Sequence, residues 1–174
     1  MFDPTAFDNM KVVFEGALYD RDNKGEIIIM DRNDLVNLAK MSRQFEVMFQ
    51  LPESRGVWAK IEMKSNMVNL AAELLSSIQN EQQAGCYLKL KFVIEKTEVL
   101  NFQELKKILL DVWGDGREIS VNTYNHPLEK EKDQLTILTV SFGRLITEDQ
   151  IEDLFEMTDF MITTLEQLNS FLSK

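Results

Sequence analysis

The C-terminal stretch from Thr147 to Leu172 places the strongest constraint on the fold. Its apolar residues recur at the three- and four-residue spacing of one helical face. Thr147 and Gln150 have the spacing of a capping box, in which each side chain satisfies a free backbone amide of the other residue. We therefore expect a long amphipathic helix, continuous or jointed near Thr158, whose apolar face is buried against upstream strands. The apolar residues of this helix are Ile151, Leu154, Phe155, Met161, Ile162, Leu165, Leu168 and Leu172.

The residues before this helix show the patterns of strands and of shorter helices. Helical spacing predicts one helix from a cap at Asp31 or Asn33 to Met41, a second from a cap at Ser65 to Ile78, and a third after Asn101. Together these elements predict an α+β fold, in which a largely antiparallel sheet of about six or seven strands is packed by about four helices. Alternating apolar and polar residues predict the strands at 10–19, 26–30, 45–51, 57–63, 87–95, 118–124 and 135–142.

The 174 residues suit one globular α+β domain, 1–174. Two parts of it, 10–84 and 85–174, share the predicted order strand, helix, strand, strand, helix. This order suggests two similar structural halves, although α+β chains also produce it without duplication. The first part followed by the strand at 87–95 also gives the β-α-β-β-α-β order of ferredoxin-like folds.

The chain carries a formal net charge of −10, from 29 acidic and 19 basic residues. Broad binding to nucleic acid or to anionic membranes needs a basic surface, so we expect neither partner. No run of about 18 apolar residues occurs, and no apolar leader follows a charged N-terminus. A single cysteine excludes an internal disulfide, and we therefore expect a cytoplasmic protein.

Residues 20–31 have some features of a calcium-binding loop. Asp20 and Gly25 hold its first and sixth positions, but position five is Lys24, and position twelve is Asp31 rather than the usual longer glutamate. A fixed positive charge among the ligands would repel the ion. A hairpin turn with Gly25 at positive φ fits these residues better, and we expect neither a metal ion nor an organic cofactor.

The sequence offers no convergent catalytic set. His126 is the only histidine and lies in an Asn-His-Pro turn, where we expect it to be exposed. Cys86 has no basic residue near it before Lys89, which favours a buried, unreactive thiol. Gly114 and Gly116 lack the residues of a phosphate loop and instead predict the end of a helix. These observations favour a protein that is not an enzyme.

Three groups of side chains are candidates for function. A cluster of acids in the last helix reads mainly as a solvated face, and as an alternative it could dock a basic partner or contact the chain's own lysines. The methionines read mainly as core residues, with an adaptable binding surface as the alternative. The acidic cluster is Glu148, Asp149, Glu152, Asp153 and Glu156. The methionines expected in the core include Met41, Met63, Met67 and Met161. The third group consists of possible ligand contacts on the outward strand faces, which are Tyr87, Lys89, Lys91 and Tyr124.

We expect from these features a non-enzymatic cytosolic adaptor or regulator that works through protein–protein contacts. Its partner would be another protein or a second copy of the chain, as in a homodimer. The alternative is a domain that binds or transforms a small molecule, with a site between the sheet and the helices.

Overall fold

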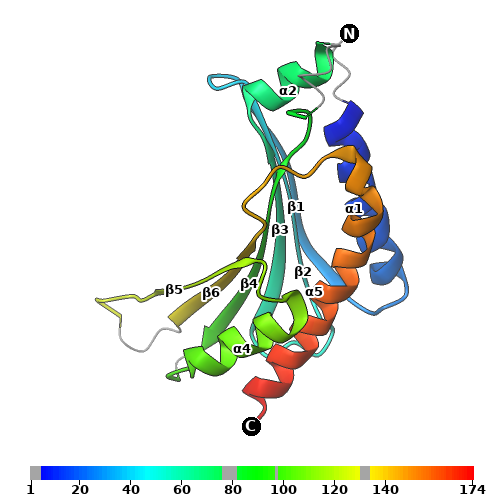
Figure 1. Cartoon of the computed structure of the whole chain (residues 1–174). Coiled ribbons are helices and arrows are strands. Elements are labelled where there is room, and N and C mark those ends of the chain that lie inside the picture. The colour runs from blue at the N-terminus through cyan, green and yellow to red at the C-terminus, as the bar shows by residue number, and fades with distance from the viewer. Residues whose placement is uncertain (1–4, 76–81, 97, 130–133) are drawn as a thin grey trace.

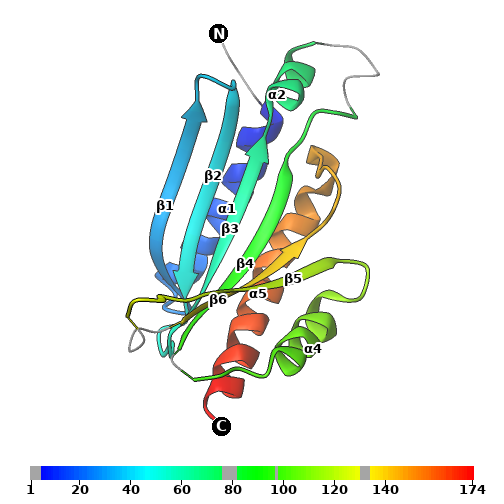
Figure 2. The same ribbon diagram turned by 90° about the vertical axis from the view of Figure 1, so that its left-hand side faces the viewer.

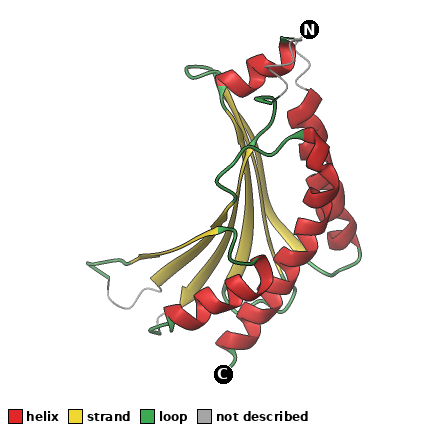
Figure 3. Cartoon of the chain, viewed as in Figure 1, coloured by secondary structure: helices red, strands yellow, loops and turns green. Residues whose placement is uncertain are grey.

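The computed structural model describes residues 5–75, 82–96, 98–129 and 134–174. In these residues one antiparallel sheet carries helices against one face, as Figures 1 and 3 show. The predicted α+β class is therefore confirmed. The strands are β1 (Ile28–Asn37), β2 (Ser42–Gln50), β3 (Val57–Ser65), β4 (Tyr87–Lys96), β5 (Glu118–Tyr124) and β6 (Gln134–Ser141), and their order in the sheet is β1-β2-β3-β4-β6-β5. The helices are α1 (Thr5–Asn23), α2 (Met67–Leu74), α4 (Phe102–Trp113) and α5 (Ile151–Leu172), with a short 3-10 turn, η1 (Glu148–Gln150), before α5.

The core lies between the sheet and the two long helices. Alternate residues of the central strands, such as Phe45, Ile61 and Phe92, face the helices and are fully buried. Helices α1 and α5 lie side by side across this inner face (Figure 1), where Phe14 and Leu165 are fully buried. Burial on this scale, at about 25 cal/mol per Å² of apolar surface, is the main stabilising term of the fold.

Helix α5 confirms the expected long amphipathic helix. The capping box of Thr147 and Gln150 precedes it, and the helix runs without a joint. Thr158 does not cap a second helix, because its hydroxyl donates to the carbonyl of Phe155 at 2.7 Å within the same helix. Phe155 departs from the expected apolar face, since it is 53% exposed. Leu154, Met161, Leu165 and Leu168 are buried as expected, whereas Ile151, Ile162 and Leu172 are half-buried.

The strand predicted at 10–19 is wrong, because these residues belong to helix α1. The run Val12–Val13–Phe14 looks like a strand locally. The buried side chains of Phe7, Met10, Phe14 and Leu18 nevertheless follow the three- and four-residue spacing of a helix. Contact with α5 and the sheet therefore decides the structure over local β-propensity.

The helix predicted to end at Met41 is also wrong. Residues 28–37 form the edge strand β1, and the chain turns back into β2 through Met41, whose φ is +49°. Among the described residues, the elements of the first half therefore follow the order α-β-β-β-α, while those of the second follow β-α-β-β-α as predicted. These described elements do not give the two halves one common order, and they do not follow the ferredoxin-like order.

The residues that resemble a calcium loop have a different structure from both alternatives considered. Asp20 and Asp22 belong to the last turn of α1 rather than to a hairpin. Gly25 does have a positive φ, +74°, as it follows the helix. Across the parts of the chain that the structure describes, no group of three acidic, histidine or cysteine side chains could hold a metal ion.

The second half matches the sequence more closely. Asn101 caps α4 by accepting hydrogen bonds from the amides of Gln103 and Glu104, and Gly114 at φ +76° ends the helix. Helix α2 begins after Asn66 rather than Ser65, and its predicted extension to Ile78 lies outside the described residues. None of the helices in the described ranges is long and apolar enough to cross a membrane.

None of the described helices packs on the second face of the sheet, here called the open face. Figure 2 views this face, with α1 and α5 behind the strands. A ladder of charged side chains crosses it: Lys60 lies 2.8 Å from Glu46 and 3.2 Å from Glu62, and Lys91 lies 2.7 Å from Glu62. These ion pairs make the centre of the open face polar, so it can face solvent without a covering helix.

Candidate functional site

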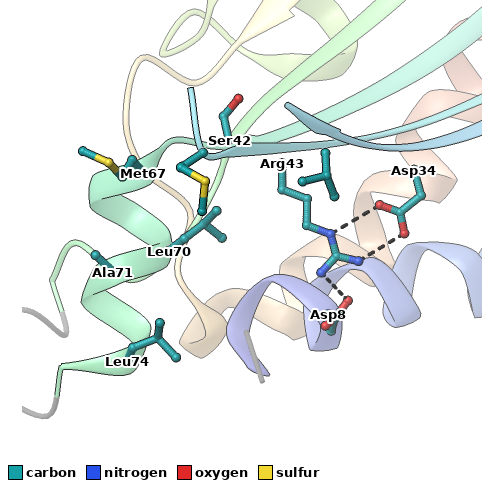
Figure 4. A pocket seen from close by; sticks show the side chains of 10 residues that line it. Asp8, Asp34, Ser42, Arg43, Met67, Leu70, Ala71 and Leu74 are labelled. Atoms are coloured by element: carbon teal, nitrogen blue, oxygen red, sulfur yellow. Dashed lines mark hydrogen bonds and ion pairs between the residues drawn. The ribbon is translucent and has the colours of Figure 1, made fainter. Parts of the chain in front are cut away.

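An apolar groove lies at one end of the molecule, between α2 and the end of the β1–β2 hairpin (Figure 4). Its volume is about 660 Å³, within the range of ~300–1,000 Å³ typical of ligand sites. Asp8, Asp34, Ser42 and Arg43 supply the polar part of its wall. The apolar lining residues are Val36, Met41, Met67, Leu70, Ala71 and Leu74.

Helix α2 builds one wall of the apolar groove by helical spacing. Its residues at positions 67, 70, 71 and 74 form one stripe, and Figure 4 shows that stripe along the groove. Met67 is 57% exposed and Leu74 45% exposed, so the stripe is incompletely covered. Asn69, on another side of the helix, donates to the carbonyl of Gln83 at 3.0 Å and ties α2 to the chain before β4.

Two methionines of the apolar groove correct a prediction from the sequence. Met41 and Met67 were expected in the core, yet Met41 is 47% exposed and both line the groove. Met63 and Met161 are fully buried, as expected. Methionine side chains are unbranched and polarizable, which lets a surface adapt to different apolar groups.

Arg43 forms the polar floor of the apolar groove. Its guanidinium lies 2.8 Å from Asp8 and 3.1 Å from Asp34, and it stacks 4.8 Å above the ring of Phe7. Lys11 adds a second ion pair to Asp34 at 2.7 Å. Burial alone would raise the pKa of Asp34, but the hydrogen bonds and charges of Arg43 and Lys11 outweigh it and lower that pKa. Asp34 therefore stays ionised near neutral pH and is unsuited to proton transfer.

The edge of the apolar groove beside α1 is acidic. Glu73 of α2 has both carboxylate oxygens buried and no side chain among the described residues donates to it, so the backbone amides at the start of α1 are its nearest donors. Burial raises the pKa of Glu73, the charges of Asp8 and Glu148 raise it further, and the backbone amides of Phe7 and Ala6 oppose the rise. Within the described ranges Glu73 and Glu148 have no cationic partner, so this edge favours a cation.

A second hollow, here called the cationic hollow, lies on the open face. It has a volume of about 360 Å³ and contains two predicted ligand contacts, Tyr87 and Lys89. Lys91 lies outside it in an ion pair with Glu62, and Tyr124 lies near the far end of β5. The structure thus brings together two of the four predicted contacts. The lining residues are Gln44, Glu62, Lys64, Asn66, Tyr87, Leu88, Lys89, Ser141, Gly143 and Arg144.

The acidic cluster of the last helix lies on η1 and the first turns of α5. Glu148, Asp149, Glu152, Asp153 and Glu156 are all exposed. Glu148 accepts a hydrogen bond from the Asn9 side chain, so this member of the cluster is held against α1. The alternative contact with the chain's own lysines is not seen among the residues described.

The remaining chemical candidates are placed as the sequence predicted. Cys86 is buried and unpaired, and burial raises the pKa of its thiol to about 12, which suppresses the reactive thiolate. His126 is exposed in the turn after β5.

Comparison of the chain with protein-family models, curated protein sequences and solved structures gives no match.

Sequence reasoning missed several residues of both sites. Val36 was assigned to a helix, and nothing in the sequence pairs Arg43 with Asp8 and Asp34. The signal for Lys64 was present, because it continues the polar alternation of Lys60 and Glu62 on one strand face. The register of β3 against β4 is needed to place Lys64 beside Tyr87.

Proposed function

We propose that this chain is a non-enzymatic binding protein that seats an apolar segment of a partner polypeptide in the apolar groove. One observation carries the proposal: exposed apolar side chains are concentrated on α2 and its end and on the tip of the β1–β2 hairpin. A cluster of this kind is typical of protein-interaction sites. These side chains are Val36, Leu38, Met41, Met67, Val68, Leu74 and Leu75.

The extent of this surface favours a polypeptide over a small molecule. Leu38, Val68 and Leu75 are exposed but do not line the apolar groove itself. A ligand that only filled the groove would leave their apolar surface in water. A polypeptide can cover the groove and these outer side chains together, and the released water stabilises the complex.

We infer that the bound segment is an amphipathic helix. Helix α2 offers a stripe of about two turns, which matches the apolar face of a helix laid in a groove. Met41 and Met67 suit a surface that accepts different apolar side chains. The exposed carboxylate of Glu148, near α2, favours basic residues on the partner, because complementary charges speed and orient docking.

The binding test uses fluorescence anisotropy with a labelled helical peptide. The peptide carries leucines at i, i+3, i+4 and i+7 and lysines elsewhere, and a scrambled peptide of equal composition is its control. We expect Met67→Asp and Leu74→Asp each to weaken binding at least tenfold, since each places a charge in the groove. Matched variants Val99→Asp and Leu128→Asp, exposed apolar positions away from the groove, should bind as the native protein does.

Three results would contradict this function. Equal binding of the scrambled peptide would show that the protein does not recognise the helical spacing of the leucines. A dimer that Met67→Asp converts to monomers would assign the groove to a second copy of the chain. Displacement of an apolar dye by a fatty acid, with no displacement by the peptide, would assign it to a small molecule.

The same proposal includes an adaptor role in the cytoplasm. A buried cysteine without a disulfide partner suits a reducing compartment.

A further inference from the structure

Three basic side chains converge on the cationic hollow of the open face. Lys64 comes from the end of β3, Lys89 from β4, and Arg144 from the turn after β6. The sheet register fixes this arrangement, because Lys64 pairs with Tyr87 and Lys89 pairs with Ser141. Residues that alternate along neighbouring strands share one face, so these side chains border one space.

None of the three cations has a carboxylate within ion-pair distance in the described parts of the chain. The one acid in the cationic hollow, Glu62, is already bound by Lys91 at 2.7 Å and by Lys60 at 3.2 Å. Burial alone would raise the pKa of Glu62, but these two lysines lower it, so Glu62 stays ionised and its charge is already paired.

Arg144 is held in place by a neutral partner. Its guanidinium donates to Gln150 Oε1 at 2.8 Å, and Gln150 belongs to the capping box before α5. Arg144 also borders a neighbouring hollow with Asp153 and Glu156, but neither carboxylate lies within 4.0 Å of it. The guanidinium can therefore give further hydrogen bonds to a bound anion.

A cluster of positive charge is unexpected in a chain of net charge −10. The three cations repel one another when the hollow holds no anion, and an anion between them would replace this repulsion by attraction. The hydroxyls of Tyr87 and Ser141 border the same space and add neutral donors. Two lysines, one arginine and two hydroxyls outnumber what one carboxylate accepts, but they suit the oxygens of a phosphate dianion.

We propose that the cationic hollow is a binding site for the phosphate group of a small molecule. The site lies on the open face and uses none of the residues that line the apolar groove. It therefore stands independently of the proposed function. The shared chemistry is the phosphate dianion, supplied either as free phosphate or as the monoester of a small metabolite.

The test is calorimetric titration of the full chain at constant ionic strength. The probes are inorganic phosphate, glycerol phosphate, succinate and a phosphoserine peptide. We expect saturable binding of both small phosphates at millimolar concentration, and weaker binding of succinate. Lys89→Gln and Lys64→Gln should each lower the affinity for phosphate about tenfold, as expected for the loss of one hydrogen bond to a charged group.

Lys106→Gln is the matched control, because it removes the same charge from an exposed position on α4 outside the hollow. It should leave phosphate binding unchanged, and thermal melts without ligand should show that every variant folds. An equal loss of phosphate affinity in Lys106→Gln would overturn the proposal, since the loss would then reflect the net charge of the protein rather than the cationic hollow. Absence of saturable binding, or binding of the phosphopeptide without the small phosphates, would overturn it as well.

Discussion

Glu73 of α2, which lies close to Asp8 of the apolar groove but does not line it, has a buried charge that the fold compensates poorly. Its carboxylate is buried beside Asp8 and Glu148, and only the amides that begin α1 oppose its raised pKa. A raised carboxyl pKa means that the folded chain binds the proton more readily than the unfolded chain. The stabilisation is then full below the unfolded pKa of about 4.3 and is lost as pH rises through the folded value.

Glu73→Gln should therefore stabilise the protein at neutral pH. The amide stays neutral, whereas ionised Glu73 carries a desolvation cost. The gain over the native chain should shrink as pH falls towards about 4, where native Glu73 is protonated as well. Urea unfolding across this pH range measures the difference, with exposed Glu156→Gln as the control. A loss of stability at neutral pH would mean that the α1 amides stabilise the carboxylate by more than burial costs.

At the scale of elements, α5 connects most parts of the structure. Its buried residues contact the sheet and α1, and Thr164 accepts a hydrogen bond from the Trp113 indole of α4 at 3.1 Å. Trp113 in turn lies 5.8 Å from Phe160, measured between ring centroids. Disruption of α5 should therefore loosen both α1 and α4.

Leu165→Asp should lower the free energy of unfolding by about 3 kcal/mol or more. Leu165 is fully buried, so an aspartate there would place an unpaired charge in the core. Gln167→Asp adds the same charge to an exposed position of the same helix and should change stability little. Chemical denaturation compares the two variants, and an equal effect of both would show that α5 is not docked as described.

The sequence predicts elements well where local pattern and tertiary burial agree. In α5 and β3 the apolar spacing matches the buried face. In α1 the β-branched Val12 and Val13 obscured the helical stripe, which became decisive only on packing against α5. In β1 the residues after Asp31 lie on an exposed edge strand, where no burial imposes an alternating pattern.

At the scale of the whole molecule, the sheet separates two surfaces with different chemistry. Helices α1 and α5 cover the inner face (Figures 1 and 2). The apolar groove lies at one end of the molecule, and the cationic hollow lies on the open face. Tyr87 and Lys89 were predictable as outward residues of a strand. Their grouping with Lys64 and Arg144 was not, because it depends on the register of β3, β4 and β6.

The apolar groove was less predictable still. Its wall at Val36 was assigned to the wrong element, and Met67 was expected to fill the core. A helical stripe in sequence does not reveal whether another element covers it. Here α2 is only eight residues long and lies beyond the end of the layer formed by α1 and α5 (Figure 1). The central claim is that a partner polypeptide completes this burial.

Hydrogen exchange of the full chain, with and without the helical peptide, tests this claim most directly. Bound peptide should slow amide exchange in α2 (residues 66–75) and in the β1–β2 end (residues 36–43), because both border the apolar groove. Residues 87–96 of the open face should exchange as before. Slower exchange confined to the open face, or no change at α2 when the peptide is bound, would contradict the assignment of the groove as the binding site.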